Sequence, residues 1–183
     1  MKRILVIDGN SIINRAYYGM RPLTTKTGKS THAVYGMINM ISKQLADIKP
    51  DYAAVAFDLK APTFRHKMYE GYKAGRHATP EELLAQFPVA KEVLSALGYH
   101  VLEMEGYEAD DILGTLAHMS EQAGDCRCYL LTGDRDSLQL IDSCVHVKLI
   151  ISKPGQTTAT LYTEELFREE YGFDPIRLID LKA

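Results

Sequence analysis

Seven carboxylates in this chain follow short apolar runs, where they could act together on one ligand. They are Asp8, Asp58, Glu108, Asp110, Asp111, Asp134 and Asp136. Apolar runs of this kind, partly β-branched, are typical of buried parallel strands. In an open α/β sheet, functional sites form just beyond the carboxyl ends of the strands. We therefore expect the seven acids to meet at one edge of one sheet.

Such a gathering of like charges predicts a cation site. Carboxylates at close range repel one another, and the pKa of one of them rises sharply unless cations lie between them. Ligand sets made only of oxygen atoms suit hard divalent ions. Acids in the first turn of a helix also stabilise the helix by interacting with its dipole. This role is the alternative interpretation of the acids from Glu108 to Asp111. One acid would meet that need, and the segment has three in four positions.

The order of the expected elements predicts an α/β fold, with a mostly parallel sheet between two layers of helices. We expect parallel strands at 3–7, 53–57, 100–104, 127–131 and 145–151, and an antiparallel edge strand at 157–162. We expect helices at 31–48, 80–97, 108–123, 137–141, 163–171 and from 175 onward. The 183 residues fit a single domain.

The stretch 60–77 is basic and aromatic. Its cations are Lys60, Arg65, Lys67, Lys73 and Arg76, against the single acid Glu70, and its aromatic residues are Phe64, Tyr69 and Tyr72. Tyr69, Tyr72, Lys73 and Arg76 are spaced by three and four, which predicts one helical face with rings and cations together. Cations bind phosphates and aromatic rings stack on bases. A solvated surface helix is the alternative, but the neighbouring acids favour nucleic acid.

Composition sets few limits. The chain is 46% hydrophobic and 25% charged, with a net charge of −3, and it has no apolar run long enough for a membrane span. If the seven acids bind metal, the other 17 of 24 acids stand against 21 Lys and Arg, which leaves +4. A polyanionic substrate is therefore not excluded. The three cysteines lack a zinc-type pattern, which favours reduced thiols in a cytoplasmic protein.

Two further positions are candidates for phosphate contact. A short helix that we expect to be capped by Ser11 carries Arg15. Lys29, Ser30 and Thr31 precede the helix at 31–48, whose first amides could hold a phosphate. The better-supported interpretation is that a Ser or Thr side chain simply caps the start of this helix.

Five motifs, in order along nearly the whole chain, resemble one family. They are Asp8-Gly9-Asn10-Ser11, Ala56-Phe57-Asp58, Tyr72-Lys73-Ala74-Gly75-Arg76, Glu108-Ala109-Asp110-Asp111 and Thr132-Gly133-Asp134-Arg135-Asp136-Ser137-Leu138-Gln139-Leu140. The resemblance is to the 5′-nuclease (5′-3′ exonuclease) domain of bacterial DNA polymerase I, in the flap endonuclease family, with a PIN-like fold.

The resemblance implies roles for individual residues. All seven acids would bind Mg²⁺ or Mn²⁺, with two ions in the complete enzyme. The stretch 65–76 would belong to a helical arch, and Lys73, Arg76 and Asp134 would be catalytic. Taken together with the basic residues noted above, the predicted DNA contacts are Arg15, Lys29, Ser30, Thr31, Arg65, Lys67, Tyr69, Tyr72, Lys73 and Arg76.

The implied activity is metal-dependent hydrolysis of DNA at 5′ ends and 5′ flaps, in replication and repair. The implied protein is monomeric, cytoplasmic and nucleoid-associated, with no membrane partner and with a polymerase region after Ala183. The family's further metal-binding aspartates and its duplex-binding helix-hairpin element also lie beyond that residue, so we expect weak activity from residues 1–183 alone.

Three other functions remain open. A PIN-type ribonuclease would share the acids, but the long basic stretch favours an arch and a flap substrate. A receiver or phosphatase-like domain would need one nucleophilic aspartate, whereas acids here end four strands. A non-catalytic DNA-binding module would be expected to have lost some of the carboxylates.

Overall fold

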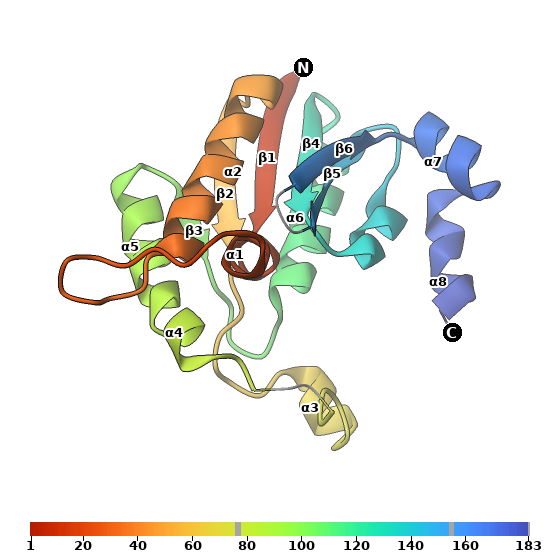
Figure 1. Ribbon diagram of the computed structural model, residues 1–183. Helices are drawn as coiled ribbons and strands as arrows, with labels where there is room; N and C mark the ends of the chain where they lie inside the picture. The colour runs from red at the N-terminus through yellow and green to blue at the C-terminus, as the bar shows by residue number, and fades with distance from the viewer. Residues whose placement is uncertain (76–77, 154–155, 183) are drawn as a thin grey trace.

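A six-stranded sheet in the order β3-β2-β1-β4-β5-β6 runs through the molecule (Figure 1). The structure, a computed structural model, describes residues 1–75, 78–153 and 156–182. The strands are β1 Lys2–Asp8, β2 Tyr52–Ala56, β3 His100–Leu102, β4 Cys126–Thr132, β5 Val145–Lys153 and β6 Gln156–Tyr162. The first five are parallel, and β6 pairs antiparallel with β5. The predicted α/β fold is confirmed.

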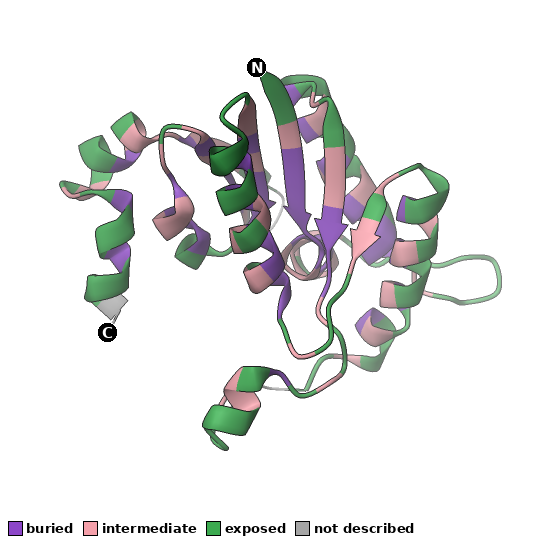
Figure 2. Ribbon diagram, turned by 180° about the vertical axis from the view of Figure 1, so that it is seen from behind, coloured by how far each residue is buried: buried purple, intermediate pink, exposed green. Residues whose placement is uncertain are grey.

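Helices cover both faces of this sheet. They are α1 Gly9–Gly19, α2 His32–Ile48, α3 Phe64–Met68, α4 Glu81–Leu84, α5 Gln86–Ala96, α6 Ala109–Ala123, α7 Glu164–Tyr171 and α8 Leu178–Lys182, with 3₁₀ helices η1 Arg135–Leu140 and η2 Pro175–Arg177. Side chains alternate along a strand, so Leu5 and Ile7 pack toward α1, α2 and α5, whereas Val6 packs toward α6. The central strands are buried toward their carboxyl ends (Figure 2).

The helix predicted over 80–97 is divided in two. Its first part, α4, ends at Leu84, and α5 begins at Gln86. The cause is Pro88, because a proline has no N–H to bond the carbonyl four residues earlier, here that of Leu84. The break turns α4 relative to α5 at the side of the molecule where the basic stretch rejoins the body (Figure 1).

The basic stretch itself lies apart from the sheet, with α3 as its only helix among the described residues (Figure 1). The prediction that Tyr69, Tyr72 and Lys73 share a helical face is therefore wrong. Tyr69 ends α3 in an extended conformation, and Lys73 has a φ of 61°. Gly71 lies between the two tyrosines, and glycine disfavours a helix by about 1 kcal/mol relative to alanine. Arg76, the fourth member of the predicted face, lies outside the described residues.

Candidate active site

A cleft of about 1410 Å³ opens beyond the carboxyl ends of β1, β2 and β4. Five of the seven predicted acids line it, and these are Asp8, Asp58, Glu108, Asp110 and Asp134. The chain moves outward in one direction from β1 to β3 and in the other from β4 to β6. The cleft thus lies where the strand order reverses, the usual place for a site in an open α/β sheet.

Asp8 is the last residue of β1 and is almost fully buried. Its carboxylate caps α1 by accepting a hydrogen bond from the Ser11 N–H at 2.9 Å, and it accepts another from Thr132 Oγ1 at 2.8 Å. The expectation that Ser11 caps this helix is wrong, and Ser11 Oγ instead accepts from the Gly133 N–H at 2.9 Å. Burial raises the pKa of Asp8 to about 6, with a smaller contribution from Asp58.

Asp58 is held on three sides. Asn10 donates from Nδ2 to Asp58 Oδ2 at 3.2 Å, and Asn10 Oδ1 accepts from the Asp58 N–H at 3.0 Å. Asp58 Oδ1 also accepts from the Ala109 N–H at 2.7 Å, at the start of α6. One carboxylate therefore ties together the segments that follow β1, β2 and β3.

Asp134 stands at the other side of the cleft, after β4. Its N–H donates to Thr132 Oγ1 at 3.0 Å, so this one buried hydroxyl bonds both Asp8 and Asp134. Arg15 donates to the Gly133 carbonyl, and its guanidinium leaves no room for a side chain at Gly133. Burial lowers the pKa of Arg15, and the nearby Asp134 opposes that effect.

The turn that starts α6 separates its three acids. Glu108 is the N-cap, and it forms a capping box with Asp111, which accepts from the Glu108 N–H at 2.9 Å. Asp110 lines the cleft and keeps an exposed side chain. Desolvation by the surrounding cleft, together with the charges of Asp8, Asp134, Asp58 and Glu108, raises its pKa to about 7. The side chain of Asp111 turns instead to Arg65, with both oxygens at 2.7 Å from the guanidinium. Asp111 and Asp136 are outside the lining of the cleft.

Two further residues of the basic stretch bond one of the cleft acids, Glu108. Lys73 Nζ lies 2.6 Å from Glu108 Oε1, and the Tyr72 hydroxyl donates to Glu108 Oε2 at 3.0 Å. The pKa of Tyr72 is raised, mainly by burial and to a smaller extent by this hydrogen bond to Glu108. Lys67 and Tyr69, also predicted to contact DNA, are exposed on the same stretch.

The residues Lys29, Ser30 and Thr31 lie outside the cleft lining. Thr31 is the N-cap of α2 but makes no capping bond with its side chain. Gln86, which is buried, instead accepts through Oε1 from the N–H groups of Ala33 and Val34 at 2.9 and 3.4 Å. A phosphate at this helix end would have to compete with the Gln86 side chain for these N–H groups.

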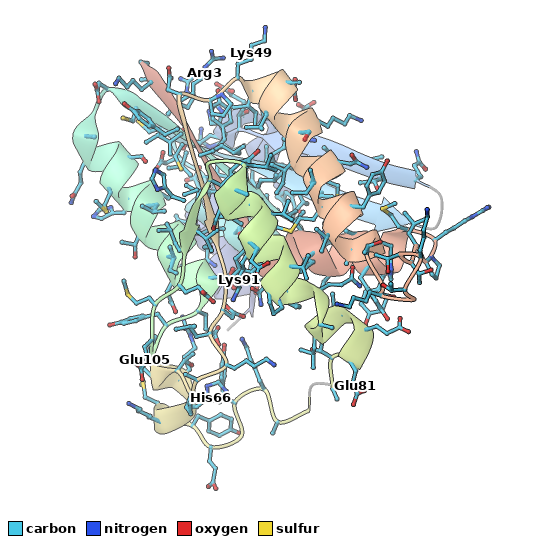
Figure 3. The ribbon with its side chains drawn as sticks, turned by 90° about the vertical axis from the view of Figure 1, so that its left-hand side faces the viewer. Arg3, Lys49, His66, Glu81, Lys91 and Glu105 are labelled. Atoms are coloured by element: carbon cyan, nitrogen blue, oxygen red, sulfur yellow. The ribbon has the colours of Figure 1, made fainter. Side chains whose placement is uncertain are left out.

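The wall opposite the acids comes from α4 and α5. Leu84, Phe87, Pro88 and Lys91 line it at helical spacing, and Lys91 is paired with Glu103. His66 on α3 lines the cleft from the opposite side of the opening (Figure 3). The cleft is thus charged at the sheet edge and largely apolar along α4 and α5.

Sequence reasoning missed the neutral residues that hold the acids, above all Asn10 and Thr132. The available signal was their position. Asn10 follows Asp8 by two residues and Thr132 precedes Asp134 by two, and short polar side chains at such offsets commonly bond the nearby backbone. The signal for Gln86 was absent, because its partner is on α2, more than fifty residues away.

The donor set of the cleft fits a hard divalent cation. All five lining acids offer oxygen ligands. Burial first and neighbouring acids second raise the pKa values of Asp8 and Asp110 to about 6 and about 7, and a bound cation would lower both. In the described part of the chain, no three Asp, Glu, His or Cys side chains already converge on one point. The acids line the walls of the cleft rather than enclosing a single position within it.

Comparison with known proteins identifies the class to which this fold and cleft belong. A family model described as the 5′-3′ exonuclease N-terminal resolvase-like domain matches residues 3–172. The chain belongs to this family, and the predicted resemblance is confirmed.

The individual relatives are much longer proteins. DNA polymerase I of Caldicellulosiruptor bescii is 42% identical over 181 residues, which are 99% of this chain and 21% of that protein. DNA polymerase I of Bacillus caldotenax is 44% identical over 182 residues, which are 100% of this chain and 20% of that protein. The chain therefore spans about a fifth of the length of these relatives.

Solved structures share the fold at lower identity. The T5 D15 protein co-crystallised with metal ions has a TM-score of 0.76 and 18% identity, with 99% of this chain and 65% of that chain covered. The catalytic core of Rad2 with a DNA substrate has a TM-score of 0.53 and 17% identity, with 98% and 53% covered. No helix in the described residues is both long and apolar enough to cross a membrane.

Proposed function

We propose that this chain is the catalytic domain of a divalent-metal-dependent 5′-3′ exonuclease and 5′-flap endonuclease that hydrolyses phosphodiester bonds in DNA. The observation that carries the proposal is the cleft, which is lined by five acids from four separate segments and by Lys73 of the basic stretch, with Lys73 and Tyr72 bonded to Glu108. Family membership supports the same reaction. A structural neighbour solved with a DNA substrate supports the choice of DNA.

The residues of the cleft have distinct parts in this proposal. Asp8, Asp58, Glu108, Asp110 and Asp134 would hold the metal ions. Divalent ions in such a site supply an activated water and neutralise charge on the leaving oxygen. Thr132 and Asn10 fix the carboxylates of Asp8 and Asp58 before any ligand arrives.

The basic stretch would bind the substrate. Lys73 is placed beside the acids, so its ammonium can meet a phosphate that bridges the stretch and the cleft. A cation at that place opposes charge that develops on the phosphate during cleavage, and its removal therefore lowers turnover. The apolar wall of Leu84, Phe87 and Pro88 would face the sugar and base next to that phosphate.

The test compares cleavage of a 5′-flap DNA with cleavage of single-stranded RNA of the same sequence, each with Mg²⁺ or Mn²⁺ and with EDTA. We expect metal-dependent cleavage of the DNA flap, and its loss in Asp110→Asn. The matched control is Asp125→Asn, because Asp125 adjoins the opposite end of β4. Preference for RNA would make the chain a PIN-type ribonuclease. Binding of flapped DNA without cleavage would make it a non-catalytic module.

A further inference from the structure

The side chain of Asp111 is directed away from the cleft that its neighbours line. It makes a two-pronged ion pair with Arg65, and both Nη–Oδ distances are 2.7 Å. Its side chain retains 21% of its accessible surface and that of Arg65 retains 33%, so solvent screens the pair only in part. Two parallel hydrogen bonds of this kind fix orientation as well as distance.

The start of the basic stretch makes further contacts at the same place. The Phe64 N–H donates to the Gly106 carbonyl at 2.9 Å, and the Phe64 and Tyr107 rings lie 5.7 Å apart. The Arg65 guanidinium also lies over the Phe64 ring, at 4.5 Å from its centre. In Figure 3 the turn that carries Glu105 lies beside α3, which is consistent with this docking.

The contacts farther along the stretch have a different character. Lys73 and Tyr72 bond Glu108, an acid that lines the cleft and that the proposed metal ions would also need. A ligand in the cleft can therefore exchange with these two contacts. Arg65 also lies 3.8 Å from Glu108 Oε2, but its two bonds of 2.7 Å go to Asp111, which is outside the cleft lining. These two bonds can persist while the cleft is loaded.

We propose that Asp111 is a positioning residue and not a metal ligand. It anchors the base of the basic stretch through Arg65, and this anchor sets where Tyr72 and Lys73 stand over the cleft. The inference rests on the proposed function, because it divides the acids of that site into those that hold ions and one that holds the stretch. It also explains why three acids in one turn are not redundant.

The test uses Asp111→Asn, Arg65→Met, the double variant, and Asp110→Asn as the comparison for a cleft acid. Asparagine at 111 can still accept the N–H bond of Glu108, so the start of α6 should survive. Arg65→Met removes the other partner of the ion pair and leaves the sequence of α6 unchanged. Chymotrypsin, which cuts after aromatic residues, reports the freedom of the stretch at Tyr69 and Tyr72.

The first readout is binding of Mn²⁺ by titration calorimetry. We expect Asp111→Asn to stay within about twofold of the parent affinity and Asp110→Asn to lose about tenfold or more, since affinity follows the charge of the ligand set. The second readout is the chymotrypsin rate, which should rise equally in Asp111→Asn, Arg65→Met and the double variant, because all three break one shared contact.

The third readout is kinetic. On a 5′-flap DNA we expect kcat to fall by about tenfold in both single variants and no further in the double, with a smaller change in KM, because misplacement costs turnover. A loss of Mn²⁺ affinity in Asp111→Asn equal to that in Asp110→Asn would overturn the proposal, as would additive losses in the double variant. A parent protein that neither binds Mn²⁺ nor cleaves DNA would refute the proposed function, while the protease comparison would still decide the anchor.

Discussion

At the scale of single residues, the cleft depends on neutral side chains as much as on acids. Thr132 Oγ1 donates to Asp8 at 2.8 Å and accepts from the Asp134 N–H at 3.0 Å. The residue is completely buried. A hydroxyl can do both because it is one donor and an acceptor. The two strand ends β1 and β4 are thus held by one atom.

We therefore expect Thr132→Val to destabilise the protein by about 1–3 kcal/mol, because it leaves buried polar groups without a partner. Thr132→Ser keeps the hydroxyl and should restore both Mn²⁺ affinity and most of the flap cleavage that the valine variant loses. Thermal unfolding and titration calorimetry measure the two effects. A serine variant as impaired as the valine variant would show that the methyl packing matters and the hydroxyl does not.

The raised pKa values of Asp8 and Asp110 predict how metal-free stability depends on pH. Both values, about 6 and about 7, lie above the usual 3.8, so the folded state binds these protons more tightly than the unfolded chain does. The resulting stabilisation is fully present below the usual value and is lost as the pH rises through about 6 for Asp8 and about 7 for Asp110. The apo protein should therefore lose stability from this source between about pH 4 and about pH 7.

The variant Asp110→Asn should flatten that pH profile and raise the unfolding temperature at high pH in EDTA. Salt should reduce the difference, because the Asp110 side chain still reaches solvent. Asp125→Asn, at the far end of β4, is the control and should leave the slope as it is. Chemical denaturation across the pH range measures the effect, and an unchanged slope in Asp110→Asn would count against charge crowding in the cleft.

At the scale of elements, the basic stretch would compete with a metal ion for an acid at the start of α6. The Lys73 ammonium lies 2.6 Å from Glu108 Oε1, a position in which it satisfies charge that a metal ion would otherwise satisfy. We expect Lys73→Met to bind Mn²⁺ several-fold more tightly than the parent, even though its turnover falls.

The matched control is Lys67→Met, which removes the same charge from the same stretch at an exposed position. Its Mn²⁺ affinity should stay close to that of the parent protein. Calorimetry in the absence of DNA separates the effect from substrate binding. Weaker Mn²⁺ binding in Lys73→Met would show that the lysine supports the ion site rather than competing with it.

At the scale of the whole molecule, charge is divided between a cleft of acids and a separate basic stretch. Phosphate contacts through Lys and Arg release counterions, so DNA binding should weaken steeply with salt. The acids oppose this attraction until cations neutralise them. We expect flapped DNA to bind more tightly in Ca²⁺ than in EDTA at equal ionic strength, as measured by fluorescence anisotropy. Equal affinities in the two buffers would place the DNA away from the cleft.

The sequence by itself determined the sheet and the place of the site. Alternating apolar runs and helical stripes predicted the five parallel strands and the edge strand, because burial on both faces leaves a strong pattern. The position of the acids after those runs predicted the cleft, since parallel strands bring their carboxyl ends to one edge. The order of the motifs was enough to identify the family.

Tertiary structure decided which of the acids share the cleft. Asp110 and Asp111 are neighbours in sequence, yet one lines the cleft and the other pairs with Arg65, from a segment more than forty residues away. No local pattern distinguishes them, because the choice depends on where a distant guanidinium is held.

The conformation of the basic stretch was decided in the same way. Spacings of three and four predicted a helix through Tyr69 and Lys73, but those residues have few apolar contacts to hold a helical face. Long-range hydrogen bonds to Glu108 fix the positions of Tyr72 and Lys73 instead. Periodicity predicts an element when burial of one face stabilises it, and it fails where separate polar contacts with distant residues take over.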